Sequence, residues 1–153
     1  MRALIQLAYQ MRRWLLAVFR VRTTGVKVTL FNPSGELLLI RNGYGDSDLF
    51  LLPGGGVSRG ESPAAAAARE VREELGLSVR DVEPVCTFES GAEGKRDTIH
   101  LFKAIVDEPP TIDDVEVIEA RFFPLDALPD RVSPATLRRI AEMKGERPID
   151  GRW

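Results

Sequence analysis

Residues 52–77 read LPGGGVSRGESPAAAAAREVREELGL and set the expected architecture of the chain. The stretch opens with a glycine-rich turn, and Ser62-Pro63 follows it after a short polar segment. This pair is typical of a helix start, because serine caps the first turn and proline fits the first helical position. Gly76 is typical of a helix end. These residues therefore predict a loop that leads directly into one helix.

Three glutamates lie close together on the expected helix, Glu70, Glu73 and Glu74. Their spacing places them on one face within roughly 100° of arc, where they repel one another unless a cation is bound. Hard divalent ions such as Mg²⁺ take oxygen ligands and are usually bound with substrate phosphates. The competing interpretation is a solvated face with Glu–Arg pairs to Arg69 and Arg72, which does not explain the triple glycine. The pattern favours a metal-dependent enzyme that acts on phosphates.

A narrow apolar stripe is expected on the other side of this helix, formed by Ala64, Ala68, Val71 and Leu75. We expect it to pack on a sheet while the three glutamates point away from the sheet. Ala66 and Ala67 fall on the acidic face, and their small side chains leave room for the glycine loop beside the carboxylates.

The stretch resembles the signature of the Nudix hydrolases, G-x5-E-x7-R-E-U-x-E-E-x-G-U, in which U is a bulky aliphatic residue. Every defined position is matched over 23 residues, by Gly55, Glu61, Arg69-Glu70-Val71, Glu73-Glu74 and Gly76-Leu77. The flanking segments LFLLPGGG and DVEVIEARFFPLDALP also resemble the family, with Phe50 and Phe122 where tryptophan is common. The resemblance covers roughly residues 23–131.

This resemblance implies an α/β/α sandwich with a mixed β-sheet, and hydrolysis of a nucleoside diphosphate linked to another moiety. It implies Mg²⁺ or Mn²⁺ as the cofactor, with these ligands: Gly55 through its carbonyl, Glu70, Glu73 and Glu74. Glu61 and Arg69 correspond to a pair that ties loop to helix by a salt bridge in the family. We therefore expect a structural role for that pair.

The expected chemistry is attack of water at phosphorus. Metal ions neutralise the diphosphate, orient it and lower the pKa of a bound water. A general base must accept the water proton, and the candidates are Glu70, Glu73, Glu116 and Glu119. The family analogy favours Glu116, six residues before Phe122, although Glu116 and Glu119 also fit exposed positions on an edge strand.

Substrate contacts are expected beyond the glycine-rich stretch. Arg41 ends a strand and is a candidate for binding a phosphate or ribose, and Tyr44 in the following loop is a candidate for stacking on a base. Lys95 and Arg96 lie in a loop that could also reach an anionic substrate. His100 sits within a strand, where a structural histidine is the favoured interpretation.

The composition limits the other possibilities. The chain has 153 residues, a net charge of −2 and a single cysteine, Cys86, expected to be small, apolar and buried. The near-neutral charge gives no general attraction to nucleic acid polymers. One cysteine excludes a disulfide framework and agrees with a cytoplasmic location, and no apolar run reaches the roughly 18 residues that span a bilayer.

The remaining pattern predicts a single mixed α/β domain over residues 1–153. Strands are expected at residues 23–32, 36–41, 79–90, 98–106 and 115–123. A second helix is expected from Ser133-Pro134 to Gly145. The expected divisions are an extra helix at 1–20, the core at 21–145 and a loosely ordered tail at 146–153.

Residues 1–20, MRALIQLAYQMRRWLLAVFR, show helical periodicity with an apolar stripe and basic residues opposite. They predict an appended amphipathic helix that packs on the domain or on a partner subunit, and an exposed stripe would favour a homodimer. Contact with a membrane surface is the less favoured alternative.

Together these features predict a cytoplasmic, metal-dependent pyrophosphohydrolase that cleaves the diphosphate linkage of a nucleotide or nucleoside diphosphate derivative. The alternative is a non-catalytic module of the same fold that binds nucleotides as a sensor. Loss of a motif glutamate would have favoured that alternative, and none is lost.

Overall fold

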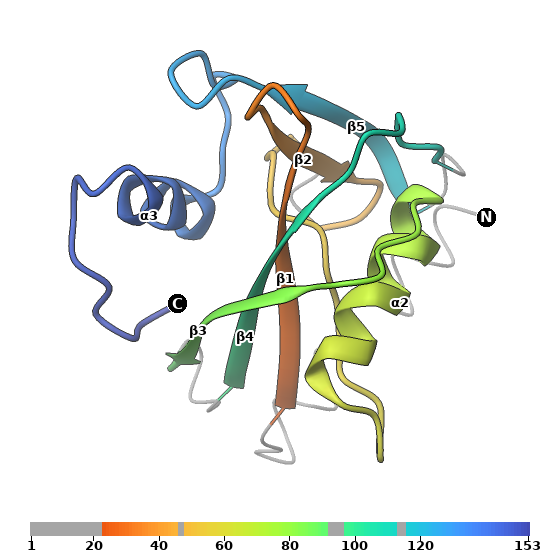
Figure 1. Ribbon diagram of the computed structural model, residues 1–153. Helices are drawn as coiled ribbons and strands as arrows, with labels where there is room; N and C mark the ends of the chain where they lie inside the picture. Colours follow the sequence, from red (N-terminus) through yellow and green to blue (C-terminus); the bar gives the residue numbers. More distant parts are fainter. Residues whose placement is uncertain (1–22, 46–47, 92–96, 113–115) are drawn as a thin grey trace.

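The computed structural model describes residues 23–45, 48–91, 97–112 and 116–153, so the helix expected at residues 1–20 lies outside the described residues. Within them the chain forms five strands and two helices (Figure 1). In chain order these are β1 (Thr23–Phe31), β2 (Leu37–Asn42), α2 (Pro63–Leu75), β3 (Glu83–Ser90), β4 (Asp97–Ile105), β5 (Val117–Phe123) and α3 (Pro134–Met143).

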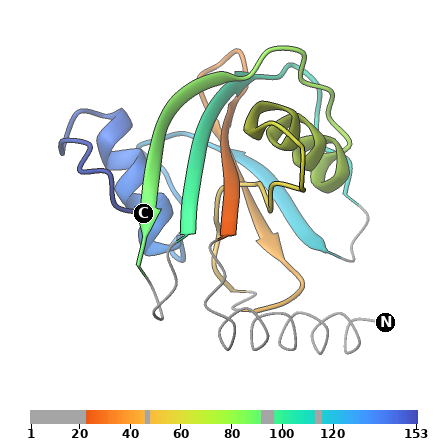
Figure 2. The same ribbon diagram turned by 90° about the horizontal axis from the view of Figure 1, so that it is seen from below.

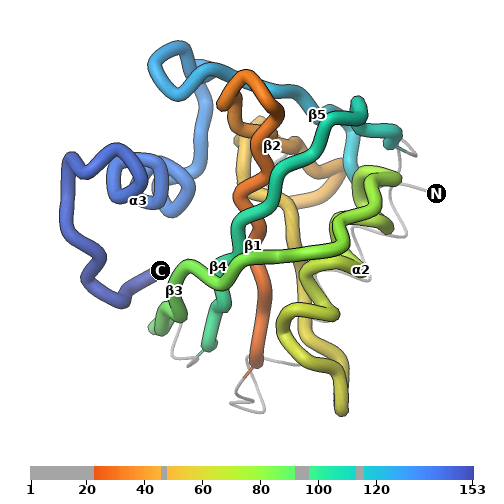
Figure 3. The backbone as a smooth tube through the Cα atoms, in the orientation of Figure 1, coloured from red at the N-terminus to blue at the C-terminus, as the bar shows by residue number. Residues whose placement is uncertain are grey.

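The strands form one mixed sheet in the order β3-β4-β1-β2-β5. Strands β1 and β4 are parallel and in register from Thr23 opposite Asp97 to Phe31 opposite Ile105, whereas the other neighbours are antiparallel. Since β1 and β2 pair only near their shared turn, the segment that follows β2 enters between them. Figure 3 shows this segment running back alongside β1 before α2 begins.

The two helices cover opposite faces of the sheet, as Figure 2 shows. One apolar core lies between the sheet and α2 and contains Val26, Val28 and Phe102 with the buried face of that helix. The other lies on the α3 side and contains Phe88 of β3, Leu101 of β4 and Ile140 of α3. This layering confirms the α/β/α sandwich with a mixed sheet. In the described part of the chain, no helix is long and apolar enough to cross a bilayer.

Both helices begin and end much as expected. The Ser62 side chain accepts a hydrogen bond from the Ala65 N–H, and Ser133 plays the same part at α3. Gly76 ends α2 with φ of 66°, the left-handed conformation that favours glycine. The start expected for the third strand, residue 79, is wrong. Val79 instead packs against the α2-side core without strand pairing.

The expectation of a loosely ordered tail at residues 146–153 is also wrong. The Glu89 N–H of β3 donates to the Gly151 carbonyl at 2.8 Å, and the Trp153 N–H donates back to the Glu89 carbonyl at 3.1 Å. The Trp153 ring meets Phe88 edge to face at 5.6 Å between centroids. The tail therefore attaches to the outer edge of the sheet through backbone pairing and an aromatic contact, neither of which leaves a periodic sequence signal.

Candidate functional site

The site is built on the glycine-rich loop, which lies along β1 as a short antiparallel partner. The Val26 N–H donates to the Gly55 carbonyl at 2.9 Å, and the Val28 N–H donates to the Pro53 carbonyl at 3.0 Å. Gly54 has φ of 132°, and a Cβ there would lie 2.2 Å from the Val26 carbonyl oxygen. Only glycine allows this close approach, so the second residue of the P-G-G-G run is fixed by packing on β1.

Two of the helix glutamates lie directly against this loop. A Cβ on Gly55 would be 2.5 Å from Oε1 of Glu70, so the missing side chain leaves the space that the carboxylate occupies. Glu74 Oε2 accepts a hydrogen bond from the Gly54 N–H at 2.8 Å, and the residue is 8% exposed. The glycines and the carboxylates therefore interlock at the junction of loop and helix.

The expected division of the helix into an apolar face and an acidic face is only partly right, because Val71 and Leu75 are buried as expected but Glu74 is buried with them. The buried positions are Ala66, Ala67, Val71, Glu74 and Leu75, while Ala64 of the expected stripe is exposed. The helix is rotated so that Glu74 faces inward, because its carboxylate is held by the loop backbone. The three glutamates consequently differ in exposure, with Glu73 the most exposed at 55% of its side chain.

Arg69 joins the loop to the helix. Its guanidinium contacts both oxygens of Glu61 at 2.8 and 3.1 Å, the Gly56 carbonyl at 2.8 Å, Glu70 at 2.8 Å and Glu73 at 3.1 Å. These bonds lower the pKa of Glu61 to about 2 and raise that of Arg69. The structure thus places Glu61 and Arg69 in the contact that the sequence suggested.

The buried carboxylates have raised pKa values. Burial raises the pKa of Glu74 to about 7, and the charge of Lys27 and the hydrogen bond from Gly54 only partly oppose it. Burial likewise raises the pKa of Glu70, while Arg69 lowers it. Glu74 therefore holds a charge that its protein surroundings compensate poorly.

The donors fit a divalent cation, although their present arrangement is not a closed set of ligands. Among the described residues, no three acidic, histidine or cysteine side chains converge on a metal-sized point. Arg69 engages Glu70 and Glu73, and Glu74 is turned to Gly54. The oxygen donors are nevertheless of the kind that Mg²⁺ prefers, and the poorly compensated charge of Glu74 is what a cation would neutralise.

The downstream glutamates occupy different positions. The Glu116 carbonyl accepts from the Gly43 N–H at 2.9 Å, and the charge of this exposed residue contributes to the raised pKa of Glu74. Glu119, three residues along, forms an ion pair with Arg41 at 2.6 Å. Glu116 is therefore the downstream glutamate whose charge reaches Glu74.

A small pocket of about 250 Å³ lies around Arg41. The Arg41 guanidinium is 5.6 Å from the centre of the Phe50 ring, and that ring meets Phe123 edge to face at 5.2 Å. Tyr44 is half-buried in the loop after β2 and does not line this pocket. Strand β5 contributes Glu119 to the pocket, and Glu116 directly precedes this strand.

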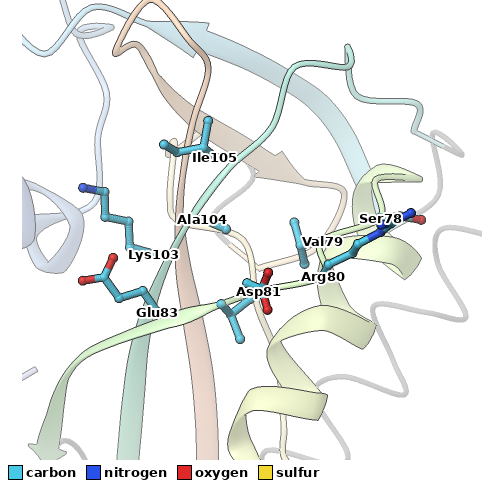
Figure 4. A pocket seen from close by; sticks show the side chains of 9 residues that line it. Ser78, Val79, Arg80, Asp81, Glu83, Lys103, Ala104 and Ile105 are labelled. Atoms are coloured by element: carbon cyan, nitrogen blue, oxygen red, sulfur yellow. The ribbon is translucent and has the colours of Figure 1, made fainter.

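A larger hollow of about 560 Å³ lies between the α2–β3 connection and β4, and none of the helix glutamates lines it (Figure 4). Its walls carry both charges, with Arg80 and Lys103 beside Asp81 and Glu83. Glu83 and Lys103 are opposite one another across the β3–β4 pair. Its size alone does not make it the functional site, because the perturbed carboxylates lie elsewhere.

Lys27 belongs to the site and was missed from the sequence. Its Nζ donates to the carbonyl oxygens of Leu52 and Gly54 at 2.9 and 3.2 Å. The available signal was a lysine within the otherwise apolar run of β1. The other early candidates lie outside the cluster: His100 is within hydrogen-bonding distance of Thr87, and Lys95 and Arg96 are outside the described residues.

Cys86, expected to be small and buried, is only half-buried on β3. It packs at the margin of the α3-side core. Strand β3 is an edge strand, so its outer positions are less covered than those of β1 or β4.

Comparisons with known proteins agree with this geometry. The NUDIX domain family model matches residues 21–143. An uncharacterized Nudix hydrolase of Pseudomonas aeruginosa is 36% identical over 107 residues, which are 65% of this chain and 61% of that protein. An RNA pyrophosphohydrolase of Cellvibrio japonicus is 43% identical over 58 residues, or 38% of this chain and 34% of that protein. The chain thus spans less than two thirds of either relative.

Solved structures show the same fold. A MutT NUDIX hydrolase from Burkholderia pseudomallei aligns with a TM-score of 0.70 at 24% identity, over 78% of this chain and 96% of that one. The NUDIX domain of Shewanella oneidensis NrtR, solved in complex with ADP ribose, aligns with a TM-score of 0.68 at 17% identity, over 82% and 88%. At these identities the likeness concerns the fold alone.

Proposed function

Because the chain belongs to the NUDIX domain family, we propose that it is a metal-dependent pyrophosphohydrolase that cleaves the diphosphate linkage of a nucleotide or nucleoside diphosphate derivative. The observation that carries the proposal is the packing of the Glu70 and Glu74 carboxylates against the glycine loop, where Glu74 is 8% exposed and burial raises its pKa to about 7. A divalent cation is the partner that the surrounding oxygen donors fit.

In this proposal the metal is held by the Gly55 carbonyl, Glu70, Glu73 and Glu74. When bound, Mg²⁺ or Mn²⁺ supplies charge neutralisation of the diphosphate and a lowered pKa for bound water. The Gly55 carbonyl accepts from the Val26 N–H of β1, so its second lone pair would be the one to reach the metal, and Arg69 holds the loop against the helix. Glu70 and Glu73, which contact Arg69 in this structure, would supply carboxylate oxygens to the cation.

Glu116 is the proposed general base. It is exposed, it acts electrostatically on Glu74, and its backbone is anchored by Gly43. A base must lie near the attacking water, and Glu119 is instead held beside the Arg41 pocket by an ion pair at 2.6 Å. Glu70 and Glu73 are proposed to contribute to catalysis as ligands of the cation. Glu70 is also the alternative general base.

Arg41 is the proposed contact for the organic part of the substrate, and Tyr44, which lies outside the Arg41 pocket, stays a prediction from the sequence alone. The pocket beside Arg41 combines a guanidinium with the rings of Phe50 and Phe123, a surface suited to a flat, partly anionic group. The relatives support a nucleotide-type substrate: one is named an RNA pyrophosphohydrolase, and one structural neighbour is complexed with ADP ribose.

The test is a release assay for phosphate and nucleotide products with Mg²⁺ or Mn²⁺. The substrate panel contains ADP-ribose, nucleotide sugars, (d)NTPs, dinucleoside polyphosphates and RNA with a 5′-triphosphate. We expect turnover of at least one substrate, loss of roughly a hundredfold or more in Glu74→Gln, and little change in Glu83→Gln, which alters an exposed glutamate outside the cluster.

Two outcomes oppose the proposal. Full activity in excess chelator would remove the metal from the mechanism. Saturable binding of ADP-ribose or another panel member, with no product formed by the intact chain, would instead support the alternative of a non-catalytic nucleotide-binding module.

A further inference from the structure

Lys27 lies in the middle of β1, beside the glycine loop. Strand alternation places its side chain on the face opposite Val26 and Val28, which belong to the core under α2. Its amine donates to the carbonyl oxygens of Leu52 and Gly54. An ammonium group has three protons, so two are committed to the loop backbone. Lys27 therefore holds the loop backbone beside β1 through its side chain.

Gly54 connects this lysine to the glutamates. The Gly54 carbonyl accepts from Lys27, while the Gly54 N–H donates to Glu74. Burial lowers the pKa of the Lys27 amine, and the charges of Glu74 and Glu70 act in the opposite direction. One glycine thus has a cation on its carbonyl side and a carboxylate on its amide side, which ties both charges to the same short stretch of backbone.

The positive charges around the cluster are divided between two residues. Arg69 forms ion pairs with Glu61, Glu70 and Glu73. Among the ion pairs of the described residues, none within 4.0 Å includes Glu74. Lys27 is instead joined to Glu74 through Gly54, whose carbonyl accepts from the Lys27 amine and whose N–H donates to the Glu74 carboxylate. Since the three glutamates repel one another at this spacing, Lys27 is the positive charge placed to stabilise the innermost one when no metal is bound.

We propose that Lys27 is a positioning residue of the metal site, which supplies the positive charge that keeps Glu74 and the glycine loop in place before a metal ion binds. The inference rests on the proposed metal-dependent function. A bound metal adds positive charge to the same cluster, so the stabilisation from Lys27 is largest in the metal-free protein and declines when metal is present. This dependence distinguishes it from a lysine that only holds the loop, whose contribution would be equal in both states.

The test compares melting temperatures in chelator and in saturating MnCl₂ for the full chain, for Lys27→Met and for Lys27→Arg. We expect Lys27→Met to melt lower in chelator, and Mn²⁺ to raise its Tm by about 3 °C or more beyond the rise seen in wild type, a typical effect of one interaction in a domain of this size. Lys27→Arg keeps the charge and should show a rise within about 1 °C of wild type.

Lys103→Met is the matched control, because Lys103 is an exposed lysine of the neighbouring strand β4 and stacks 5.6 Å over Phe31. Its metal-induced rise should equal that of wild type. An equal or smaller rise in Lys27→Met overturns the inference, and so does an enlarged rise in Lys27→Arg. If Lys27→Met folds only with Mn²⁺, the inference is supported; if it folds in neither condition, Lys27→Gln takes its place. No rise in wild type would contradict the metal site itself, and with it both proposals.

Discussion

Glu74 combines two properties that rarely occur together, near-complete burial and a carboxylate without an adjacent ion pair among the described residues. Its raised pKa has a definite effect on stability. A group whose folded pKa lies above its unfolded value favours the folded state most when it is protonated. The stabilisation is complete below about pH 4.5 and is lost as the pH rises through about 7. Metal-free protein should therefore weaken across this window.

Glu74→Gln should remove this pH dependence, since the amide is neutral at every pH and its oxygen can still accept from Gly54. In chelator near pH 8, we expect the variant to be more stable than wild type by up to about 3.5 kcal/mol, which is the shift from 4.5 to about 7 at about 1.4 kcal/mol per unit. Near pH 5 the two should be close. Urea unfolding at both pH values measures the difference.

The same variant should gain no stability from Mg²⁺ or Mn²⁺, whereas wild type should. A constant difference between the two proteins at both pH values would contradict the assignment of the raised pKa to Glu74. Glu83→Gln, at an exposed position outside the cluster, should leave the pH dependence unchanged and serves as the control.

At the scale of elements, the glycine loop and α2 act as one unit. The loop is fixed on β1 by two backbone hydrogen bonds, and the helix is fixed on the loop by Glu74 and Arg69. Helix start and end were predictable because the caps are local, as Ser62 and Gly76 show. The face that α2 buries was not, because the inward turn of Glu74 depends on a contact with Gly54 from another element.

Gly54→Ala should disrupt this unit. The added Cβ would lie 2.2 Å from the Val26 carbonyl, at a φ of 132° that alanine rarely adopts. We expect a loss of at least about 3 kcal/mol in unfolding free energy, measured by urea titration. Gly91→Ala is the control, because its Cβ would meet no atom of the described residues within 4 Å, and it should change stability by less than about 0.5 kcal/mol. Equal stability of both variants would contradict the tight packing of loop on β1.

For the whole molecule, the tail joins α3 to the far edge of the sheet. Arg139 of α3 is fully buried, with its guanidinium 3.9 Å from the centre of the Phe88 ring and 5.2 Å from that of Trp153. It also donates to the Arg152 carbonyl at 2.9 Å and pairs with Glu142 at 2.7 Å. The last residues thus complete the α3-side core.

Trp153→Ala should therefore destabilise the protein although it lies far along the chain from the glycine loop. We expect a loss of about 2 kcal/mol, because a half-buried ring that packs on Phe88 and Arg139 is removed. Ile149→Ala, at a position that is 52% exposed, should stay within about 0.5 kcal/mol. Urea unfolding of both variants makes the comparison, and equal effects would mean that the tail is not held through its ring.

The sequence predicted the fold class and most elements, because period-2 strands, capped helices and the Nudix motif are local patterns. It did not predict contacts that join distant segments. Lys27 stands out in the sequence only as the charged residue of β1, and its contact with the loop follows from the assembled sheet. The pairing of residues 151–153 with Glu89 depends on backbone atoms that every residue has. Such features follow from the assembled molecule rather than from any stretch of it.

The parallel pairing of β1 with β4 has a consequence for how the protein folds. These strands form the centre of the sheet, yet Thr23 and Asp97 are 74 positions apart in the chain. Contacts between distant segments require a large loop to close first, which slows folding. A nascent chain that has not yet reached Asp97 contains the whole glycine loop and α2, but it lacks the strand that supplies Phe102 and Ala104 to the core beneath the helix. The glycine loop and α2 are therefore synthesised well before β4, the strand that completes the core beneath the helix.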